Sequence, residues 1–155
     1  MAEDPPSNVP GERRLPRPPS ERYRAVEEPA APVRTRSRAI TWGMATAILG
    51  AAAITVAGGL LAITAGLLVI AGVVGWAVAV AVVNGGGASL GGARRVGTAV
   101  TLAVTGVGLG QLGLWVLARQ EGGVLPPLDY LAEVFGLLVP LELAIAGVVA
   151  WWRSR

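Results

Sequence analysis

Apolar side chains fill residues 39–83, a stretch of 45 positions without a single charged residue. A stretch this long is typical of membrane-spanning helices, which need about 20 residues each to cross a bilayer. One continuous helix of this length would measure about 67 Å, roughly twice the thickness of the hydrocarbon core. We therefore predict two spans, at about residues 39–57 and 60–83, with the chain reversing at Gly58 and Gly59.

Two further apolar stretches follow along the chain. Residues 84–95 are rich in glycine and end in two arginines, which predicts a flexible connector. Residues 96–117 carry no charge and predict a third span. A polar loop with two prolines comes next, and residues 130–152 predict a fourth span. The expected fold is therefore all-α, an integral membrane bundle of four transmembrane helices.

The first part of the chain has a different character. Residues 1–38 contain eight of the 11 prolines, eight arginines and six acidic residues, with few large apolar side chains. Such a segment cannot bury enough apolar surface to offset the entropy lost on ordering. We expect residues 1–38 to be a disordered cytoplasmic tail rich in proline and arginine, and residues 39–155 to form the transmembrane domain.

The arginines near the ends of the spans predict the orientation, because Arg is retained on the cytoplasmic side of a membrane. With four spans, nine arginines share one side and only Arg119 lies on the other, whereas three spans would divide the nine. Both termini are therefore expected in the cytoplasm. The nine residues are Arg22, Arg24, Arg34, Arg36, Arg38, Arg94, Arg95, Arg153 and Arg155.

The composition restricts the chemistry. The chain has no Cys, no His and no Lys, which excludes disulfides, thiol and imidazole catalysis, Schiff bases and the usual zinc and haem ligands. We expect no enzyme, no cofactor and no metal, although carboxylate chemistry remains open. The net charge of +3 forms no basic face for nucleic acid, because acids neutralise most of the tail. Arg without Lys, beside abundant Ala and Gly, is typical of GC-rich bacterial genomes, so we expect a bacterial plasma (inner) membrane.

Small residues recur at a spacing of four along the predicted spans. Such positions let the backbones of lipid-embedded helices approach closely. Thr101 and Thr105 are expected to extend the small-residue face of the third helix. These faces either hold the four helices together or receive another protein, and both interpretations stay open here. The candidate packing residues are Gly43, Ala47, Ala71, Gly75, Gly106 and Gly110.

Glu142 is an acidic residue inside an apolar span, and its expected position is near the bilayer midplane. A carboxylate there costs about 3 kcal/mol on insertion scales, so it normally faces a partner or a cavity. Pro140 removes a helical hydrogen bond just before it and predicts a kink. Gln111 on the third span is an available polar partner. Glu142 is therefore either an ion or proton site or a polar clamp between helices.

Short fragments near the last two spans resemble a known family. They are similar to parts of the proteolipid ring subunits of rotary ATPases, whose duplicated form has four spans. The resemblance covers about twenty residues and implies that Glu133 carries the ion. Glu133 follows a polar, proline-containing loop, and the first two spans do not repeat the last two, so we assign no family. The fragments are LAEVFGL at 131–137, the glycines Gly106, Gly108 and Gly110, and the run at 118–120.

These observations predict a small non-enzymatic membrane protein with several spans. Its expected partners are the lipid bilayer and other membrane proteins or further copies of itself, with no nucleic acid. In the leading hypothesis it is an accessory or assembly subunit that packs against other membrane proteins. The alternative is transport of protons, cations or a small solute that uses Glu142.

Overall fold

The computed structural model describes residues 35–61, 66–86, 89–122 and 125–155. Within these ranges the chain is helical and contains no strand, which confirms the all-α expectation for this part. The predicted tail, up to residue 34, lies outside the described residues. The elements are α1 (Arg36–Thr55), the π-helical segment η2 (Val56–Leu60), α2 (Leu67–Gly86), α3 (Gly92–Gln120), α4 (Pro127–Val134) and α5 (Leu138–Ser154).

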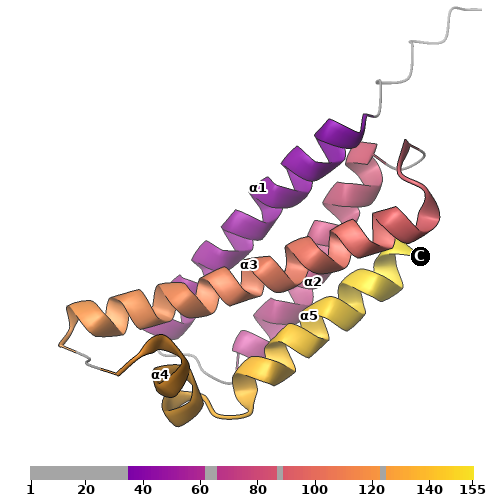
Figure 1. The fold of residues 1–155 in the computed structure, drawn as a ribbon. Helices are drawn as coiled ribbons and strands as arrows, with labels where there is room; N and C mark the ends of the chain where they lie inside the picture. The colour runs from indigo at the N-terminus through magenta and orange to yellow at the C-terminus, as the bar shows by residue number, and fades with distance from the viewer. Residues whose placement is uncertain (1–34, 62–65, 87–88, 123–124) are drawn as a thin grey trace, which may run out of the picture. The chain divides into compact units, whose positions relative to one another are not determined.

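Four long helices run side by side, and the short α4 turns away from α5 (Figure 1). Helices α1 and α5 both pack against α2 and α3, and α2 also contacts α3. The starts of α1 and α3 and the ends of α2 and α5 lie at one end of the molecule. We call this the arginine end. Its six described arginines are Arg36, Arg38, Arg94, Arg95, Arg153 and Arg155.

Several helices are long and apolar enough to cross a membrane. Three stretches meet this criterion alone, namely Arg36–Leu60, Leu67–Gly86 and Gly92–Gln120. Helices α4 and α5 meet it only together, and they are bent by 94°. Helix α5 has 17 residues and is about 25 Å long, slightly shorter than a hydrocarbon core of about 30 Å. The described residues therefore offer three spans, or four if the bent pair counts as one.

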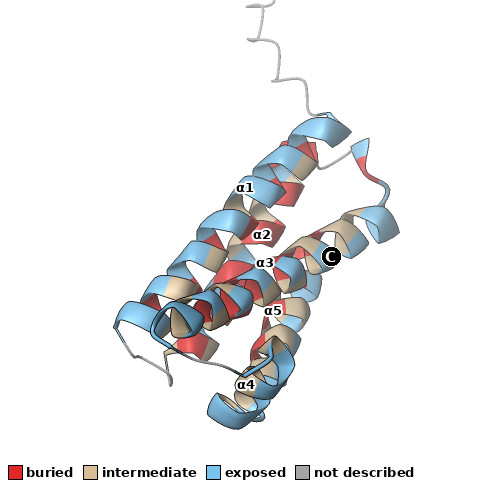
Figure 2. Ribbon diagram, turned by 60° about the vertical axis from the view of Figure 1, so that its left-hand side comes forward, coloured by how far each residue is buried: buried red, intermediate tan, exposed pale blue. Residues whose placement is uncertain are grey.

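The buried residues lie on the faces that the long helices turn toward one another (Figure 2). Most of them are Ala, Val or Gly, so the helix backbones come close together. A Cβ added to Gly75 on α2 would lie 2.9 Å from the Cα of Ala146 on α5. A Cβ added to Gly106 on α3 would lie 3.0 Å from the carbonyl oxygen of Ala47 on α1. The helices are therefore held by dispersion contacts between backbones at small residues.

Gly58 and Gly59 do not form the predicted turn. Both lie in η2, and the chain stays helical to Leu60. Their small size serves packing against α3, because a Cβ on Gly59 would lie 2.6 Å from Leu117 Cδ1. Glycine marks close helix contacts as well as turns in apolar helices, so the sequence pattern was ambiguous. The second span consequently begins at Leu67 instead of residue 60.

The predicted connector 84–95 is also largely helical. Helix α2 continues to Gly86 and α3 begins at Gly92, which leaves only a short link. Gly85 and Gly86 lie in the last turn of α2, and their lack of a side chain lets Ala39 of α1 approach, with 2.8 Å between an added Gly85 Cβ and the Ala39 Cα. Helix α1 likewise begins before the predicted boundary at residue 39.

The predicted fourth span, 130–152, is broken between α4 and α5. Gly136 adopts φ +54°, and its N–H donates to the carbonyl oxygens of Leu131 and Ala132 at 3.1 Å, which ends α4. Pro140 is the third residue of α5, where a missing N–H costs no helical hydrogen bond. The expected kink at Pro140 was therefore wrong, and the bend lies just before it.

Replacing Gly75 by Ala should destabilise the fold, because the new Cβ would overlap the backbone of Ala146. We expect a loss of about 1–3 kcal/mol in the free energy of unfolding, the usual cost of overpacking. The control is Gly97→Ala on α3, where a Cβ meets nothing within 4 Å and Ala should gain about 0.5–1 kcal/mol of helix stability. Unfolding in mixed micelles measures both variants. Equal stability of the two would contradict the close contact.

Candidate functional site

Glu142 and Gln111 form a polar pair inside the helix packing. Glu142 lies in the second turn of α5 with 0% of its surface exposed, and Gln111 of α3 is 1% exposed. The Nε2 of Gln111 donates a hydrogen bond to Oε2 of Glu142. Pro140 lies half a turn earlier on the exposed side of α5. The structure thus brings together two of the three residues singled out around this site and leaves the third at the surface.

Glu142 lies near one end of its helix and not in the middle of one continuous span. Because α4 turns away, the helix that carries Glu142 begins only at Leu138. Glu142 therefore lies about 6 Å from the start of α5, in the half of the helix nearer to α4. The pair is buried by the packing of the neighbouring helices around it.

One oxygen of each partner remains without a hydrogen bond among the described residues, namely Oε1 of Glu142 and Oε1 of Gln111. An amide and a carboxylic acid are complementary groups, since the acid accepts from the amide N–H and donates its own O–H to the amide oxygen. A proton on Oε1 of Glu142 would make this oxygen a donor, and its O–H would donate to Oε1 of Gln111. The pair can therefore act as a clamp between α3 and α5 and also hold a proton.

The charged side chains of the described helices lie away from this pair. Helix α2 has none, and those of α1 are Arg36 and Arg38 at the arginine end. The charged residues of α3 lie near its two ends, and those of α4 are Asp129 and Glu133. Within the described ranges no three His, Cys, Asp or Glu side chains form a group that could hold a metal ion. The chemistry of this site is therefore that of one carboxyl group and one amide.

A second polar contact joins α1 to α3 and was not anticipated from the sequence. The Thr55 hydroxyl lies 3.0 Å from the Ala51 carbonyl oxygen and 3.2 Å from that of Gly110, and it can donate to either. Gly113 leaves the space for this hydroxyl, because a Cβ there would overlap the Thr55 side chain. A threonine in an apolar span is a weak signal for such a contact, and its partner lies 55 residues away in sequence.

Arg95 joins the start of α3 to the end of α5. Its Nε donates to the Ser154 carbonyl oxygen and its Nη2 to the Arg155 carbonyl oxygen, both at 2.9 Å. These bonds satisfy carbonyl groups that the last turn of a helix leaves unpaired. The Arg155 guanidinium lies 3.4 Å from the ring centroid of Trp151, a cation–π contact. Arg95 was singled out for topology and also serves as a helix cap.

The other predicted residues are placed as follows. The six small packing residues are all buried between helices. Thr101 and Thr105 are exposed and lie on a different side of α3 from Gly106, because adjacent helical positions are 100° apart. They do not extend its small-residue face as expected. Six of the arginines named for topology lie at the arginine end, and Arg22, Arg24 and Arg34 lie outside the described residues.

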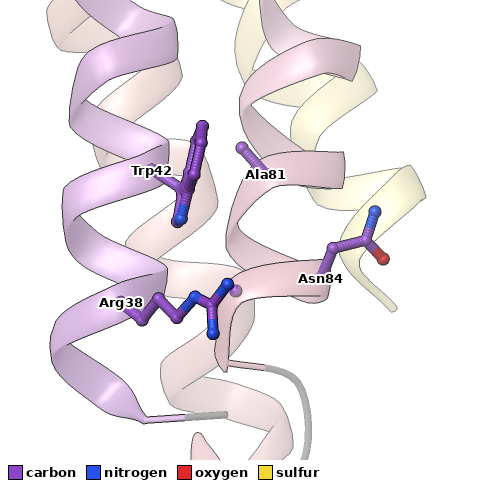
Figure 3. A pocket seen from close by; sticks show the side chains of 5 residues that line it. Arg38, Trp42, Ala81 and Asn84 are labelled. Atoms are coloured by element: carbon purple, nitrogen blue, oxygen red, sulfur yellow. The ribbon is translucent and has the colours of Figure 1, made fainter. Parts of the chain in front are cut away.

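A pocket of about 300 Å³ opens between α1 and α2 at the arginine end. Arg38 and Trp42 line it from α1, and Ala81, Asn84 and Gly85 line it from α2 (Figure 3). In the sequence, Arg38 and Trp42 stand at i and i+4, a spacing that places two side chains next to each other on one face of a helix. Nothing in the sequence linked them to Asn84, because it lies on another helix.

Comparisons with models of protein families, with curated proteins and with solved structures give no match for this chain. Glu133, the ion carrier implied by the resemblance to proteolipid ring subunits, is exposed on α4. The buried acid among the described residues is Glu142 on α5.

Replacing Gln111 and Glu142 by the isosteric, apolar Met tests whether the pair is a clamp. Each single substitution leaves one buried polar partner and should cost about 1–3 kcal/mol in the free energy of unfolding. The double variant should lose less than the sum of the two, by roughly 0.6–2 kcal/mol. The free energies of unfolding of the wild type, the two single variants and the double variant are measured in mixed micelles. Leu112→Met, on the exposed side of α3, is the control. Additive losses would show that the two side chains are not coupled.

Proposed function

We propose that this chain is a small non-enzymatic membrane protein that binds transmembrane helices of other proteins, as an accessory or assembly subunit. The observation that carries the proposal is the outward side of α3 near the arginine end. Gly97, Thr101 and Thr105 are exposed there, with the half-buried Gly108 next in line. A Cβ at Gly97 or Gly108 would meet nothing within 4 Å. We call these four residues the α3 outer face.

The α3 outer face would let a partner backbone approach closely, as small residues do in membrane helix pairs. The neighbouring outward surfaces are different, because α1 exposes Trp42 and Leu49 and α2 exposes Val69 and Val73. Such large apolar side chains suit contact with lipid. The contrast is confined to the half of α3 nearer to the arginine end, since α3 exposes Leu109, Leu112 and Val116 beyond Gly108. It supports that half of α3 as the part that receives a protein partner.

The threonine hydroxyls add polar capacity to the α3 outer face. Thr46 and Thr98 donate to the carbonyl oxygen four residues earlier, at 2.8 Å. Within the described part of the chain, the hydroxyls of Thr101 and Thr105 make no hydrogen bond. A hydroxyl that faces an apolar medium gains from a partner, and interhelical bonds of this type contribute about 0.6 kcal/mol each. Both hydroxyls are thus available to donate to a second protein.

The proposed orientation has four spans and both termini in the cytoplasm of a bacterium. It is supported by the gathering of six described arginines at one end, whereas Arg119 lies near the other. In this orientation α5 is the fourth span. Helix α4 has no buried residue and carries Leu128 and Val134 beside Asp129 and Glu133, so it would lie along the outer surface of the membrane.

Leucine at both Thr101 and Thr105 should block the partner by filling the α3 outer face. We expect the wild-type protein, extracted from its own membrane in mild detergent, to run in a defined assembly with other chains. The double variant should reduce the recovered partner about tenfold, because a loss of about 1.4 kcal/mol in the free energy of binding lowers the affinity by this factor. The control is Val73→Leu at an exposed position of α2, and this variant should retain the partner. Recovery of the wild-type chain alone would refute the proposal.

Transport of protons or cations is a second candidate function, favoured by the two buried oxygens that lack donors in the Gln111–Glu142 pair. Replacing Glu142 by Gln separates it from the clamp. The amide can keep two hydrogen bonds with Gln111 but cannot release a proton. The leading proposal expects wild-type and variant vesicles to show the same pH-dependent flux as empty vesicles. A wild-type flux that disappears in the inserted variant would establish transport instead.

A further inference from the structure

The pocket at the arginine end is built by the close approach of α1 and α2. Gly85 lies against the backbone of α1, where an added Cβ would be 3.1 Å from the Arg38 carbonyl oxygen. Gly85 and the small Ala81 both line the pocket from α2. In Figure 3 the Arg38 side chain reaches from α1 toward α2, and the nitrogen of the Trp42 indole lies on the side nearer to Arg38.

The polar groups of the pocket have no partner within the described residues. Arg95, at the same end, uses two of its N–H groups on the last carbonyls of α5. Arg38 makes no such bond in the described part of the chain and faces no described acid. The Trp42 indole N–H is also unbonded there, whereas that of Trp115 donates to the Leu125 carbonyl oxygen at 3.0 Å. Among the described residues nothing accepts from the Arg38 guanidinium or the Trp42 indole, and a ligand can take this place.

The donors in the pocket select an anion. Guanidinium groups present several N–H donors to phosphate oxygens, and the Trp42 indole can add one more. The start of α1 favours an anion and the end of α2 opposes it, and both lie beside the pocket, so the positive charge of the site comes from Arg38. Arg38 is the ionisable residue of the pocket lining. The pocket thus matches a group such as a phosphate ester.

An apolar stripe continues from the pocket along the outward side of α1. Trp42, Leu49 and Val56 follow one another at intervals of seven residues, and they are 57%, 71% and 46% exposed. Seven residues are about two helical turns, so the three side chains lie in one row. A free phosphate would make no use of this row. A lipid would place its head group in the pocket and an acyl chain along the row.

We propose that the pocket lined by Arg38, Trp42 and Asn84 binds the phosphate head group of an anionic phospholipid. The site lies at the arginine end between α1 and α2 and does not involve the α3 outer face, so the lipid and a protein partner would bind independently. Arg38 supplies the charge, the Trp42 indole N–H orients the phosphate, and the row on α1 holds the acyl chain. The lipid would also bridge α1 and α2 at the point where Gly85 brings them together.

Native mass spectrometry of the full chain, purified with added phosphatidylglycerol, tests the proposal. We expect about one retained lipid per chain, with phosphatidylcholine retained much less. Arg38→Gln should lower the retained fraction about fivefold, the effect of one arginine near a charged lipid surface. Ala81→Leu should lower it too, by narrowing the pocket without a change of charge. Arg36→Gln removes the same charge from an exposed residue outside the pocket lining, and it should have little effect on the retained fraction.

Three results would overturn the proposal. An equal loss in Arg36→Gln and Arg38→Gln would show a general effect of charge. Equal retention of phosphatidylcholine would remove the role of the anion. Displacement of the lipid by millimolar glycerol 3-phosphate would show that the site takes a soluble phosphate ester. The Thr101 and Thr105 double variant should retain the lipid, so failure of the proposed protein partner and failure of this site are separate outcomes.

Discussion

Close approach of helix backbones at small residues is the constraint on which this structure depends. Apolar helices in a bilayer gain little from burying one apolar surface against another, because lipid is equally apolar. They associate through dispersion contacts, which weaken quickly with distance. Gly75 against Ala146 and Gly106 against Ala47 bring α2 to α5 and α3 to α1. Gly85 against Ala39 brings α1 to α2 in the same way, and the pocket lies between these two helices.

Helix α3 takes part in each of the polar contacts between long helices described above. The Gly110 carbonyl oxygen lies within hydrogen-bonding distance of the Thr55 hydroxyl of α1, Gln111 donates to Glu142 of α5, and Arg95 caps the end of α5. The first two contacts come from neighbouring residues that face different helices. At 29 residues α3 is also the longest helix. It holds α1 and α5 in place, and its outward side carries the proposed α3 outer face.

The molecule separates its polar groups by position. The arginines and the pocket are at one end, and the Gln111–Glu142 pair is enclosed between α3 and α5. At the arginine end itself, two arginines have different uses. Arg95 caps the end of α5, whereas Arg38 lines the pocket. A guanidinium whose N–H groups are used by the protein contributes to stability, and one whose N–H groups remain free contributes binding capacity.

The sequence by itself determined the helical class, the approximate positions of the apolar helices and the gathering of arginines beside their ends. These properties depend on hydropathy along the chain and on the need of every backbone group for a hydrogen bond in an apolar medium, and both are local. It also indicated Gln111 as a partner of Glu142, because few polar side chains occur in the apolar stretches. The tertiary structure alone decided that Gly58 and Gly59 continue a helix, that Gly136 ends one, and that Arg38 and Asn84 line one pocket. A glycine permits a turn and a close contact equally, and only the neighbouring helix determines which of the two forms.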